Sequence, residues 1–539
     1  MLFRSTFEGA QYAFVPGQGL GSINPGSGIA AIGNGTNAST TIQNVFTWSD
    51  DMNYTRGSHS FKFGTLINRF QPWLLTGTNV RGVIRFANLA AFLNGQTNSV
   101  QAVTPGSIVD RTYRYTTYGF YAQDDWRATN RFTLNLGLRY EFHSNFAERF
   151  GHGAALRDLV RDNATTVGDV FVNPSLKNFS PRLGFAWDVR GNGRTAVRGG
   201  FGLLYDVAGG FMAGLKISTV ATPPFSSQST VGTTQTLTIP LTFPAASVGR
   251  GLRLQDYHMQ QPHLLSYNLT VERQLPFDMG ATITYAGTRG INVLQAKEGN
   301  PTIPLGVPQN GTCVPRPAGS TYTVDGPKCW LNIGTDPRTN PAWDNIELVT
   351  ASASSWYNSL QLSLQKRLTH GLQFQSSYTW SKAIDEGQQV IVGDTSDYPS
   401  DPTDRRVDKG PAGFDIRSNW HFNTTYRIPQ YAGNGLLQKL TSGWQASAIW
   451  SVQSGFAITP DLTSNRSRSN NNNAFGGPSD RPNLLSSRNH QSLTEGSTAG
   501  CAGVRAGQQL RTPDLYFDPC GFERSEEHTS ELQSRFGIS

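Results

Sequence analysis

The strongest pattern in the chain is an alternation of apolar and polar residues, which is clearest between Tyr118 and Phe142. From Phe132 to Phe142, every even position is apolar or aromatic and every odd position is polar, charged or glycine. A side-chain period of two predicts a β-strand with one apolar and one polar face. Residues Tyr118–Trp126 repeat the alternation, and the polar segment Arg127–Asn130 joins the two arms. The stretch therefore predicts a β-hairpin.

Hairpins of the same kind recur along the chain. Asn192-Gly193, between the arms 179–189 and 195–205, is a strong hairpin signal. In all we expect about 12 strands, with one or two more near residues 98–104. One short helix is predicted over Phe86–Gly95, ended by its glycine. The remaining pairs of arms lie at 42–54 and 61–67, 265–271 and 281–285, 360–368 and 372–380, and, less tightly, 420–428 and 444–452.

The connections between the predicted strands alternate between short and long. The long ones are rich in Gly, Pro, Asn, Ser and Asp, and they lie at about 143–178, 206–262, 288–355, 381–415 and from 456 onward. A soluble sandwich has no reason to place all its long loops at one end, whereas an outer-membrane barrel has short periplasmic turns and long extracellular loops.

Tryptophans support a membrane barrel because they fall on the apolar parity of their strands, most of them near a strand end. Interfacial girdles of such barrels require this placement. The alternative is that these side chains form the interior of an ordinary β-sandwich. The residues concerned are Trp48, Trp126, Trp187, Trp380, Trp420, Trp444 and Trp450.

Composition is consistent with an all-β protein. Charged residues make up 15% of the 539 residues, aromatics 11%, and there are 57 glycines. The mean hydropathy of −0.38, without any run of 18 apolar residues, excludes a helical membrane protein. It is compatible with a barrel, in which only alternate residues face lipid. The net charge of +7 is spread without a Lys/Arg run, so we expect no nucleic-acid partner.

The four cysteines fall into two local pairs, Cys313 with Cys329 and Cys501 with Cys520. Each pair lies in a Gly/Pro-rich loop without a CxxC motif or a histidine partner, which favours loop-closing disulfides over a zinc site. Disulfides imply an oxidising compartment, either the periplasm or the cell surface.

Neither end of the chain has the sequence features that we expect at the ends of a complete secreted protein. Residues Met1–Glu8 lack a basic start followed by an apolar core, so we expect the natural N-terminus to lie upstream. Residues 1–39 are expected to be a loop or a truncated barrel segment, 40–460 the barrel strands, and 461–523 an extracellular-loop-like segment. Residues 524–539 contain a string that looks like one translated frame of a sequencing adapter, and they are set aside as an artefact.

Five short strings, by their order and spacing, resemble TonB-dependent outer-membrane receptors of the large type with a carboxypeptidase-regulatory-like N-terminal domain. They are Tyr118–Trp126, Leu134–Glu141, Phe179–Ala186, Ser377–Lys382 and Phe414–Arg417. The resemblance implies a barrel of about 22 strands in the outer membrane of a Gram-negative-type bacterium. It also implies a plug domain, absent from this chain, through which the TonB complex delivers energy for import. The solute stays open among siderophores, glycans, peptides and vitamin complexes.

The expected fold is therefore all-β, a partial transmembrane antiparallel barrel with about 12–14 of the strands of a 22-stranded family barrel. We expect Asn135, Arg139 and Glu141 to line the lumen or face the plug, and loops 206–262 and 288–355 to form most of the recognition surface. A charge at Leu136 is expected to impair insertion by about 2 to 4 kcal/mol if that residue lies near mid-bilayer. The predicted lipid-facing residues are Phe132, Leu134, Leu136, Leu138, Tyr140 and Phe142.

We find no sequence motif for catalysis, cofactor binding or metal binding, and we expect none of these activities. HExxH and GxSxG spacings are missing from the sequence. Asp124 and Asp125 are adjacent on a strand, so they point to opposite faces and cannot share a substrate. The acidic loop Asp394–Asp408 offers oxygen ligands for Ca²⁺ but lacks an EF-hand spacing.

The predicted function is import of a scarce solute by a plugged outer-membrane receptor, without enzymatic activity. Two alternatives remain at this stage. One is a soluble or surface-anchored β-rich adhesion or binding protein. The other is a secreted carbohydrate-active enzyme, which would require a pair of carboxylates on one strand face at a cleft.

Overall fold

A computed structural model describes most of the chain. The residues outside the description are 1–9, 27, 34–38, 233–238, 243–247, 310–311, 322, 324–325, 327, 332–335, 388–397, 430–434, 442, 461–468, 470–480 and 524–539. The predicted artefact at 524–539 therefore lies outside the described residues.

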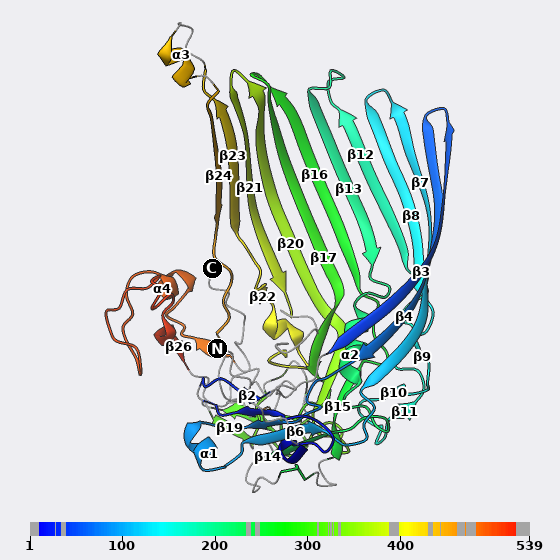
Figure 1. The fold of residues 1–539 in the computed structure, drawn as a ribbon, viewed down its shortest axis with the longest axis vertical. Coiled ribbons are helices and arrows are strands. Elements are labelled where there is room, and N and C mark those ends of the chain that lie inside the picture. The colour runs from blue at the N-terminus through cyan, green and yellow to red at the C-terminus, as the bar shows by residue number, and fades with distance from the viewer. Residues whose placement is uncertain are drawn as a thin grey trace.

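Twelve long strands form one antiparallel sheet in which each strand pairs with the next (Figure 1). The expected number of about 12 barrel strands is confirmed. Among the described residues, β3 and β24 each have a long neighbour on one side only, so the wall is open there. The strands are β3 (Thr40–Arg56), β4 (His59–Leu75), β7 (Asp110–Thr129), β8 (Phe132–His143), β12 (Phe179–Asp188), β13 (Thr195–Tyr205), β16 (His263–Leu275), β17 (Met279–Glu298), β20 (Ile346–Thr369), β21 (Leu372–Asp385), β23 (Ser418–Arg427) and β24 (Gln445–Gln453).

Short and long connections lie at opposite ends of this sheet, as the sequence predicts (Figure 1). The end with short turns is called the turn end, and the other the loop end. The β23–β24 connection is the long exception at the turn end, and it carries α3 (Leu436–Thr441). Five short turns, at 57–58, 130–131, 189–194, 276–278 and 370–371, join the other strand pairs at the turn end.

Three predicted strand boundaries are wrong, because these strands extend beyond the segments in which apolar and polar residues alternate most clearly. The predicted turn Arg127–Asn130 lies mostly inside β7, which continues to Thr129 with a register shift after Arg127. At the loop end, β17 continues to Glu298 and β20 begins at Ile346, so the predicted loop 288–355 shrinks to 299–345. The 20 residues of β7 likewise begin at Asp110 rather than near Tyr118.

Small strands and short helices cover the loop end, and this layer is called the cap. The expected extra strand near 98–104 is β6 (Ser99–Val103), which pairs with cap strands β5 and β14 and not with a barrel strand. Strand β15 (Val248–Gln255) joins the cap to the barrel sheet by running parallel to the start of β20. The other cap strands are β1 (Ser22–Asn24), β2 (Ile32–Gly33), β5 (Val83–Arg85) and β14 (Gln228–Gly232).

The remaining elements are short. They are η1 (Ala10–Tyr12), α1 (Leu89–Leu93), β9 (Ala147–Glu148), β10 (Ala154–Ala155), β11 (Thr166–Val167), α2 (Phe211–Ser218), β18 (Gly306–Gln309), β19 (Thr312–Pro315), η3 (Arg405–Asp408), β22 (Gly410–Pro411), β25 (Asn483–Leu484), α4 (His490–Thr494), η4 (Pro519–Gly521) and β26 (Phe522–Glu523). None of the described helices is long and apolar enough to cross a membrane.

The short helix predicted over 86–95 is present as α1 at the loop end (Figure 1). Asn88 caps it by accepting a hydrogen bond from the Ala91 N–H at 2.9 Å. Gly95 follows the helix with φ of 68°, a left-handed conformation that glycine adopts without a side-chain clash. Phe92 packs edge-on against Phe86 with ring centroids 5.2 Å apart, which anchors α1 on the cap.

The two faces of the barrel sheet differ sharply. The face that carries Phe132, Leu134 and the other even residues of β8 is called the outer face, and the opposite one the inner face. Trp48, Trp380 and Trp450 are 58%, 54% and 49% exposed on the outer face. Tryptophans in the interior of a soluble sandwich would be buried, so the sandwich interpretation is wrong for these residues.

The six predicted lipid-facing residues lie together on the outer face by register. Leu136 and Leu138 are 38% and 48% exposed, and the other four are partly exposed. Such exposure of a continuous apolar face is what contact with lipid requires. Lipid contact itself stays a prediction.

Asp124 and Asp125 point to opposite faces. Asp125 faces inward, and its Oδ1 accepts hydrogen bonds from Asn135 Nδ2 at 2.5 Å and Gln123 Nε2 at 3.1 Å. Asp124 lies on the outer face, where its Oδ2 is 2.7 Å from Nδ1 of His59. The His59 ring also stacks on Trp126, with centroids 5.4 Å apart. This polar pair lies beside the 57–58 turn and marks the turn-end limit of the apolar outer face.

We predict that a charge at Leu138 is more damaging than one at Leu136. Leu138 pairs with Ala122 and Pro181 and lies closer to the middle of the apolar band, whereas Leu136 lies opposite Asp124, nearer its edge. In a receptor that contains this chain, Leu138→Arg should cost insertion about 2 to 4 kcal/mol, and Leu136→Arg less. The measurement is the fraction of heat-modifiable protein in the outer-membrane fraction.

The matched control for this prediction is Gly137→Arg on the inner face of the same strand. A Cβ at residue 137 meets nothing closer than 3.7 Å, so the side chain has room. Equal insertion of the Leu138→Arg and Gly137→Arg proteins would show that the outer face does not contact lipid.

Candidate functional site

The inner face of the barrel sheet is polar near the turn end. Tyr121 donates a hydrogen bond to Asp51 at 2.6 Å, and both side chains lie over Gly64. A Cβ at Gly64 would lie 2.3 Å from each of them, so the close approach requires glycine. Arg139 and Glu141 form an ion pair at 2.7 Å on the same face. This wall can therefore contact water or a polar solute.

A charged cavity of about 410 Å³ lies on the inner face near the turn end, across β13, β16, β17 and β20. Arg198 and Glu272 face each other across two of these strands, with Nη2 and Oε2 3.4 Å apart. Charges of both signs suit a polar surface that binds solute or another protein segment. The other charged or amide residues in the lining are Arg194, Arg273, Gln274, Asp278, Gln365 and Arg367.

Closer to the cap, the inner face becomes aromatic. Tyr115 stacks between Phe70 and Phe146, with centroids 4.7 and 3.9 Å away. Helix α2 buries Phe211 and Leu215 in the same cluster, which is called the inner core. Sequence reasoning missed this cluster because it began the strand near Tyr118 and so left Tyr113 and Tyr115 outside it. The sequence did carry a signal: the aromatic residues Tyr118 and Phe120 are at even positions, whereas Tyr113 and Tyr115 are at odd positions and so face the other side of the strand.

A second cavity, of about 410 Å³, lies where α2 begins beside the ends of β13 and β16. Leu204, Leu264 and Leu294 supply apolar lining, and Asp206 lies at its rim. The Asp206 carboxylate has a structural role, because it accepts hydrogen bonds from the Gly209 and Gly210 N–H groups at 2.8 and 3.0 Å.

A buried polar hub fastens the loop 299–345 to the barrel sheet. Glu298 Oε1 accepts hydrogen bonds from the N–H groups of Asn300 and Ile346, each at 2.8 Å. The Asn300 amide in turn donates to the carbonyls of Asn340, Trp343 and Asp344, each at 2.9 Å. Both ends of the loop are thereby held at one point.

Two carboxylates lie side by side in this hub, since Glu298 pairs with Glu347 across β17 and β20. Arg338 lies 3.6 Å from Glu298, and Arg253 lies 3.3 Å from Glu347. Burial is the main cause that raises the pKa of Glu298 to about 7, against the opposing effect of Arg338 and the backbone donors. Burial also raises the pKa of Glu347, while Arg253 lowers it. Burial, with a smaller contribution from the neighbouring Glu347, therefore brings the pKa of Glu298 close to neutral pH.

The acidic loop considered for Ca²⁺ binding is largely neutralised by basic side chains. Asp401 pairs with Lys328 and Asp408 with Arg481. Asp404 Oδ1 is 2.8 Å from Arg406 Nε. Asp394 and Asp397 lie outside the described residues. Among the residues that the structure describes, no group of three or more His, Cys, Asp or Glu side chains is placed to hold a metal ion.

Both cysteine pairs suggested by local spacing are disulfides in the structure. Cys313 and Cys329 have Cα atoms 5.9 Å apart, and Cys501 and Cys520 have Cα atoms 5.6 Å apart. The first disulfide joins β19 to Cys329 within the loop 299–345, and the second joins residue 501 to η4. Each disulfide closes a loop and so restricts the conformations open to the unfolded chain.

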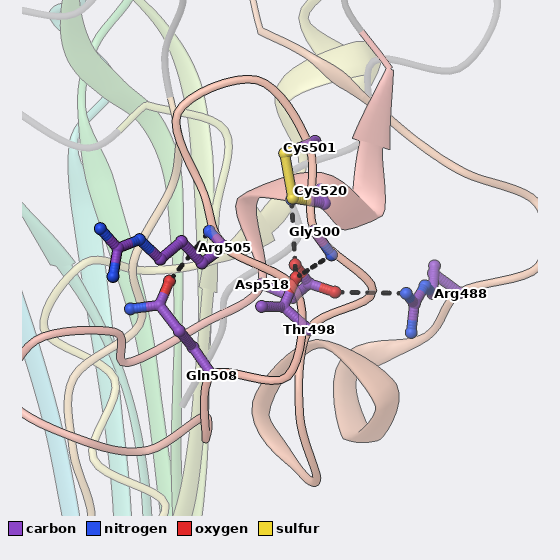
Figure 2. Close-up of a disulfide and its surroundings, with 8 residues drawn as sticks. All are labelled: Arg488, Thr498, Gly500, Cys501, Arg505, Gln508, Asp518 and Cys520. Carbon is purple, nitrogen blue, oxygen red and sulfur yellow. Dashed lines mark hydrogen bonds and ion pairs between the residues drawn. A yellow bond between two sulfur atoms is a disulfide. The ribbon is translucent and has the colours of Figure 1, made fainter.

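Figure 2 shows the buried carboxylate of Asp518 beside the second disulfide. Asp518 Oδ1 accepts hydrogen bonds from Thr498 Oγ1 at 2.6 Å and from the Cys520 N–H at 3.1 Å. Its Oδ2 lies 3.2 Å from Arg488 Nη2. The segment is therefore held by one covalent bond and one fully partnered charge.

A family model described as "Outer membrane beta barrel domain" matches residues 4–538. No curated protein matches the chain.

Several solved outer-membrane proteins are similar in structure. The outer membrane transporter YddB from Escherichia coli shares 12% identity at a TM-score of 0.44, over 80% of this chain and 44% of that one. The alcaligin outer membrane receptor FauA from Bordetella pertussis shares 12% identity at a TM-score of 0.35, over 77% and 46%. The siderophore receptor PirA from Pseudomonas aeruginosa shares 11% identity at a TM-score of 0.31, over 73% and 54%. The chain spans about half the length of these proteins.

We predict that the hub at Glu298 weakens as pH rises. The folded-state pKa of about 7 exceeds the ordinary value of 4.5, so the folded protein binds the proton more tightly, and its stabilising effect is lost as pH rises through 7. Hydrogen exchange at the Asn300 and Ile346 amides should be more protected at pH 5.5 than at pH 8, after correction for intrinsic rates. The difference should be on the order of 3 kcal/mol at most.

Glu298→Gln should remove most of this pH dependence, because the amide oxygen still accepts the two N–H groups. The control is Glu495→Gln, at an exposed ion pair with Arg511. Protection that rises from pH 5.5 to pH 8 in the unmodified protein would contradict the prediction.

We also predict that the inner core stabilises the cap. Phe211→Ala removes a side chain that is 1% exposed and should destabilise the cap by about 3 to 5 kcal/mol. Limited proteolysis of the 206–262 segment should then be faster. Phe414→Ala, at a residue 65% exposed, should change the rate little. Equal cleavage rates in the two variants would exclude a stabilising role for Phe211.

Proposed function

The chain belongs to the outer membrane beta barrel domain family, and we propose that it forms the barrel strands and cap of a receptor that imports a scarce solute with energy delivered through TonB. Energy coupling would require a plug domain, which the barrel strands and cap described above do not supply. Family membership places the protein in the outer membrane. The finer assignment to TonB-dependent import is supported by the strings around Tyr118–Trp126 and Phe179–Ala186 noted in the sequence.

The contrast between the two faces of one sheet is the observation that carries this proposal. The outer face exposes tryptophans and leucines, as lipid contact requires, while the inner face carries hydrogen-bonded polar groups and ion pairs such as Arg139–Glu141. A polar inner wall behind an apolar outer wall suits a passage for a hydrophilic solute.

Solute capture is assigned to the exposed surface of the cap. The two predicted recognition loops meet there, because Arg250 Nε lies 3.3 Å from Asp344 Oδ1 and the Asp344 N–H donates to the Arg250 carbonyl at 2.9 Å. Both side chains of this ion pair are about half exposed. Residues of the same loops that are buried, such as Phe211 and Trp343, support the surface instead of contacting solute.

The alternatives fit less well. Family membership disfavours a soluble adhesion protein and a secreted enzyme alike. A carbohydrate-active enzyme requires two accessible carboxylates. The neighbouring carboxylates of Glu298 and Glu347 are both buried and lie beside Arg338 and Arg253.

The test is uptake by cells that make a receptor containing this chain. Radiolabelled ferric siderophores, cobalamin and oligosaccharides serve as probes, each measured with and without a functional TonB. We expect TonB-dependent uptake of at least one probe. Arg250→Ala with Asp344→Ala should lower that uptake by roughly fivefold, because two exposed contacts are removed.

Replacing Arg161 and Asp158, an exposed pair in the loop 144–178, provides the matched control. Uptake of these probes that does not need TonB would contradict the proposal. An equal effect of both double substitutions would instead reject the location of the recognition surface.

A further inference from the structure

The loop-end limit of the apolar outer face carries a row of aromatic rings. Tyr118 stacks on Phe142 with centroids 4.9 Å apart, and Tyr140 stacks on Phe179 at 4.6 Å. Tyr140 and Phe142 lie 5.3 Å apart, so the rings form one continuous row across β7, β8 and β12. We call these four residues the aromatic row. Such rows mark the boundary between the hydrocarbon region and the head groups.

Three arginines lie on the outer face just beyond the aromatic row. Ile67 pairs with Tyr118 of the aromatic row, and Arg69, two residues further along β4, pairs with Thr116. Arg114 pairs with Ala147 on β9, and Arg149 comes directly after β9. The Arg149 N–H donates to the Thr112 carbonyl at 2.8 Å, which keeps that residue in register with β7. Together, Arg69, Arg114 and Arg149 are called the arginine cluster.

The depth of the arginine cluster agrees with a membrane boundary. Arg69 lies ten positions along β4 from His59, which marks the turn-end limit of the apolar face. Ten strand residues tilted by about 45° span roughly 25 Å, the height of the apolar band of an outer-membrane barrel. The cluster therefore lies at the level of the head groups on the loop side.

The positive charges of Arg69 and Arg149 lie close enough to Arg114 to repel its guanidinium group. Arg69 bonds to the neutral hydroxyl of Thr116 at 3.0 Å, and Arg114 bonds to the Tyr113 carbonyl at 2.7 Å. The Arg149 guanidinium lies over the exposed Phe150 ring, 5.4 Å from its centroid. Partial burial, followed by the positive charges of Arg149 and Arg69, lowers the pKa of Arg114. A bound anion would relieve this repulsion.

Two carboxylates lie near the cluster, and both are occupied by other donors. Glu148 accepts hydrogen bonds from the N–H groups of Thr112, Phe150 and His152 at 2.9, 2.9 and 2.7 Å. Asp110 accepts one from the Trp73 indole at 3.0 Å. Glu148 is the weakest of the influences on the pKa of Arg114, after burial, Arg149 and Arg69, so its charge offsets that of the cluster only in part.

We propose that Arg69, Arg114 and Arg149 bind the phosphate groups of a phosphorylated lipid in the outer leaflet. Guanidinium groups match phosphate oxygens in geometry and charge. A lipid, unlike free phosphate, also brings acyl chains alongside the aromatic row beneath the cluster. The proposal concerns the outer face and does not depend on which solute the receptor imports.

The experiment measures binding of purified receptor containing this chain to phosphatidylethanolamine vesicles that contain bisphosphorylated lipid A or its dephosphorylated form. We expect preferential binding to the phosphorylated form. The triple variant Arg69→Gln/Arg114→Gln/Arg149→Gln should lose about fivefold per charge, and on the order of a hundredfold in all. Arg127→Gln/Arg131→Gln/Arg190→Gln, with the same charge change at exposed turn-end residues, should retain the preference.

Heat-shifted gel mobility verifies that each variant is folded. If the glutamine variant does not fold, the lysine variant at the same positions keeps the charge and should lose only part of the preference. Equal losses in the cluster and control variants would overturn the proposal. So would equal binding to both lipid forms, or full competition by inorganic phosphate, which would indicate a site for free phosphate instead.

Discussion

The whole structure depends on the register of the antiparallel ladder. In lipid no water is available for backbone N–H and C=O groups, so a wall can cross the membrane only if each strand is bonded to its neighbours. A slip of one residue would turn every apolar side chain of that strand to the wrong face. Strand β8 is held on both sides, with Leu136 paired to Asp124 on β7 and to Leu183 on β12. The outer apolar face and the inner polar face are both consequences of that pairing.

The ladder also explains how the cap is held. Strands β17 and β20 leave the membrane span as a pair and continue to the Glu298–Glu347 level, where β15 joins alongside β20. The cap is therefore an extension of the barrel wall. The hub at Asn300, the inner core around α2 and the disulfide at Cys313 hold the loops on that extension. A solute that binds the cap is thus mechanically linked to the strands, which suits a receptor whose loops and lumen act together.

Local sequence predicted much of this arrangement, and the reason is physical. A period of two reports directly on a strand with two different faces, so the hairpins, the short turns and the exposed tryptophans could be predicted. The contacts that escaped prediction join residues far apart in the chain. The parallel pairing of Leu252 with Ile346, and the packing of Phe211 against Phe146 and Phe171, leave no periodic signature. The buried pair Glu298–Arg338 is of the same kind, because each residue alone resembles an exposed charge in a polar loop.

The most direct test of the central claim, that one face of this wall contacts lipid, is a nitroxide scan of residues 132–142 in the membrane-inserted receptor. Accessibility to oxygen, which concentrates in the bilayer, is compared at each position with accessibility to a water-soluble nickel complex. We expect oxygen accessibility to alternate with a period of two and to be highest at Leu134, Leu136, Leu138 and Tyr140. An absent alternation, or one with its maxima at Asn135, Gly137 and Arg139, would contradict it.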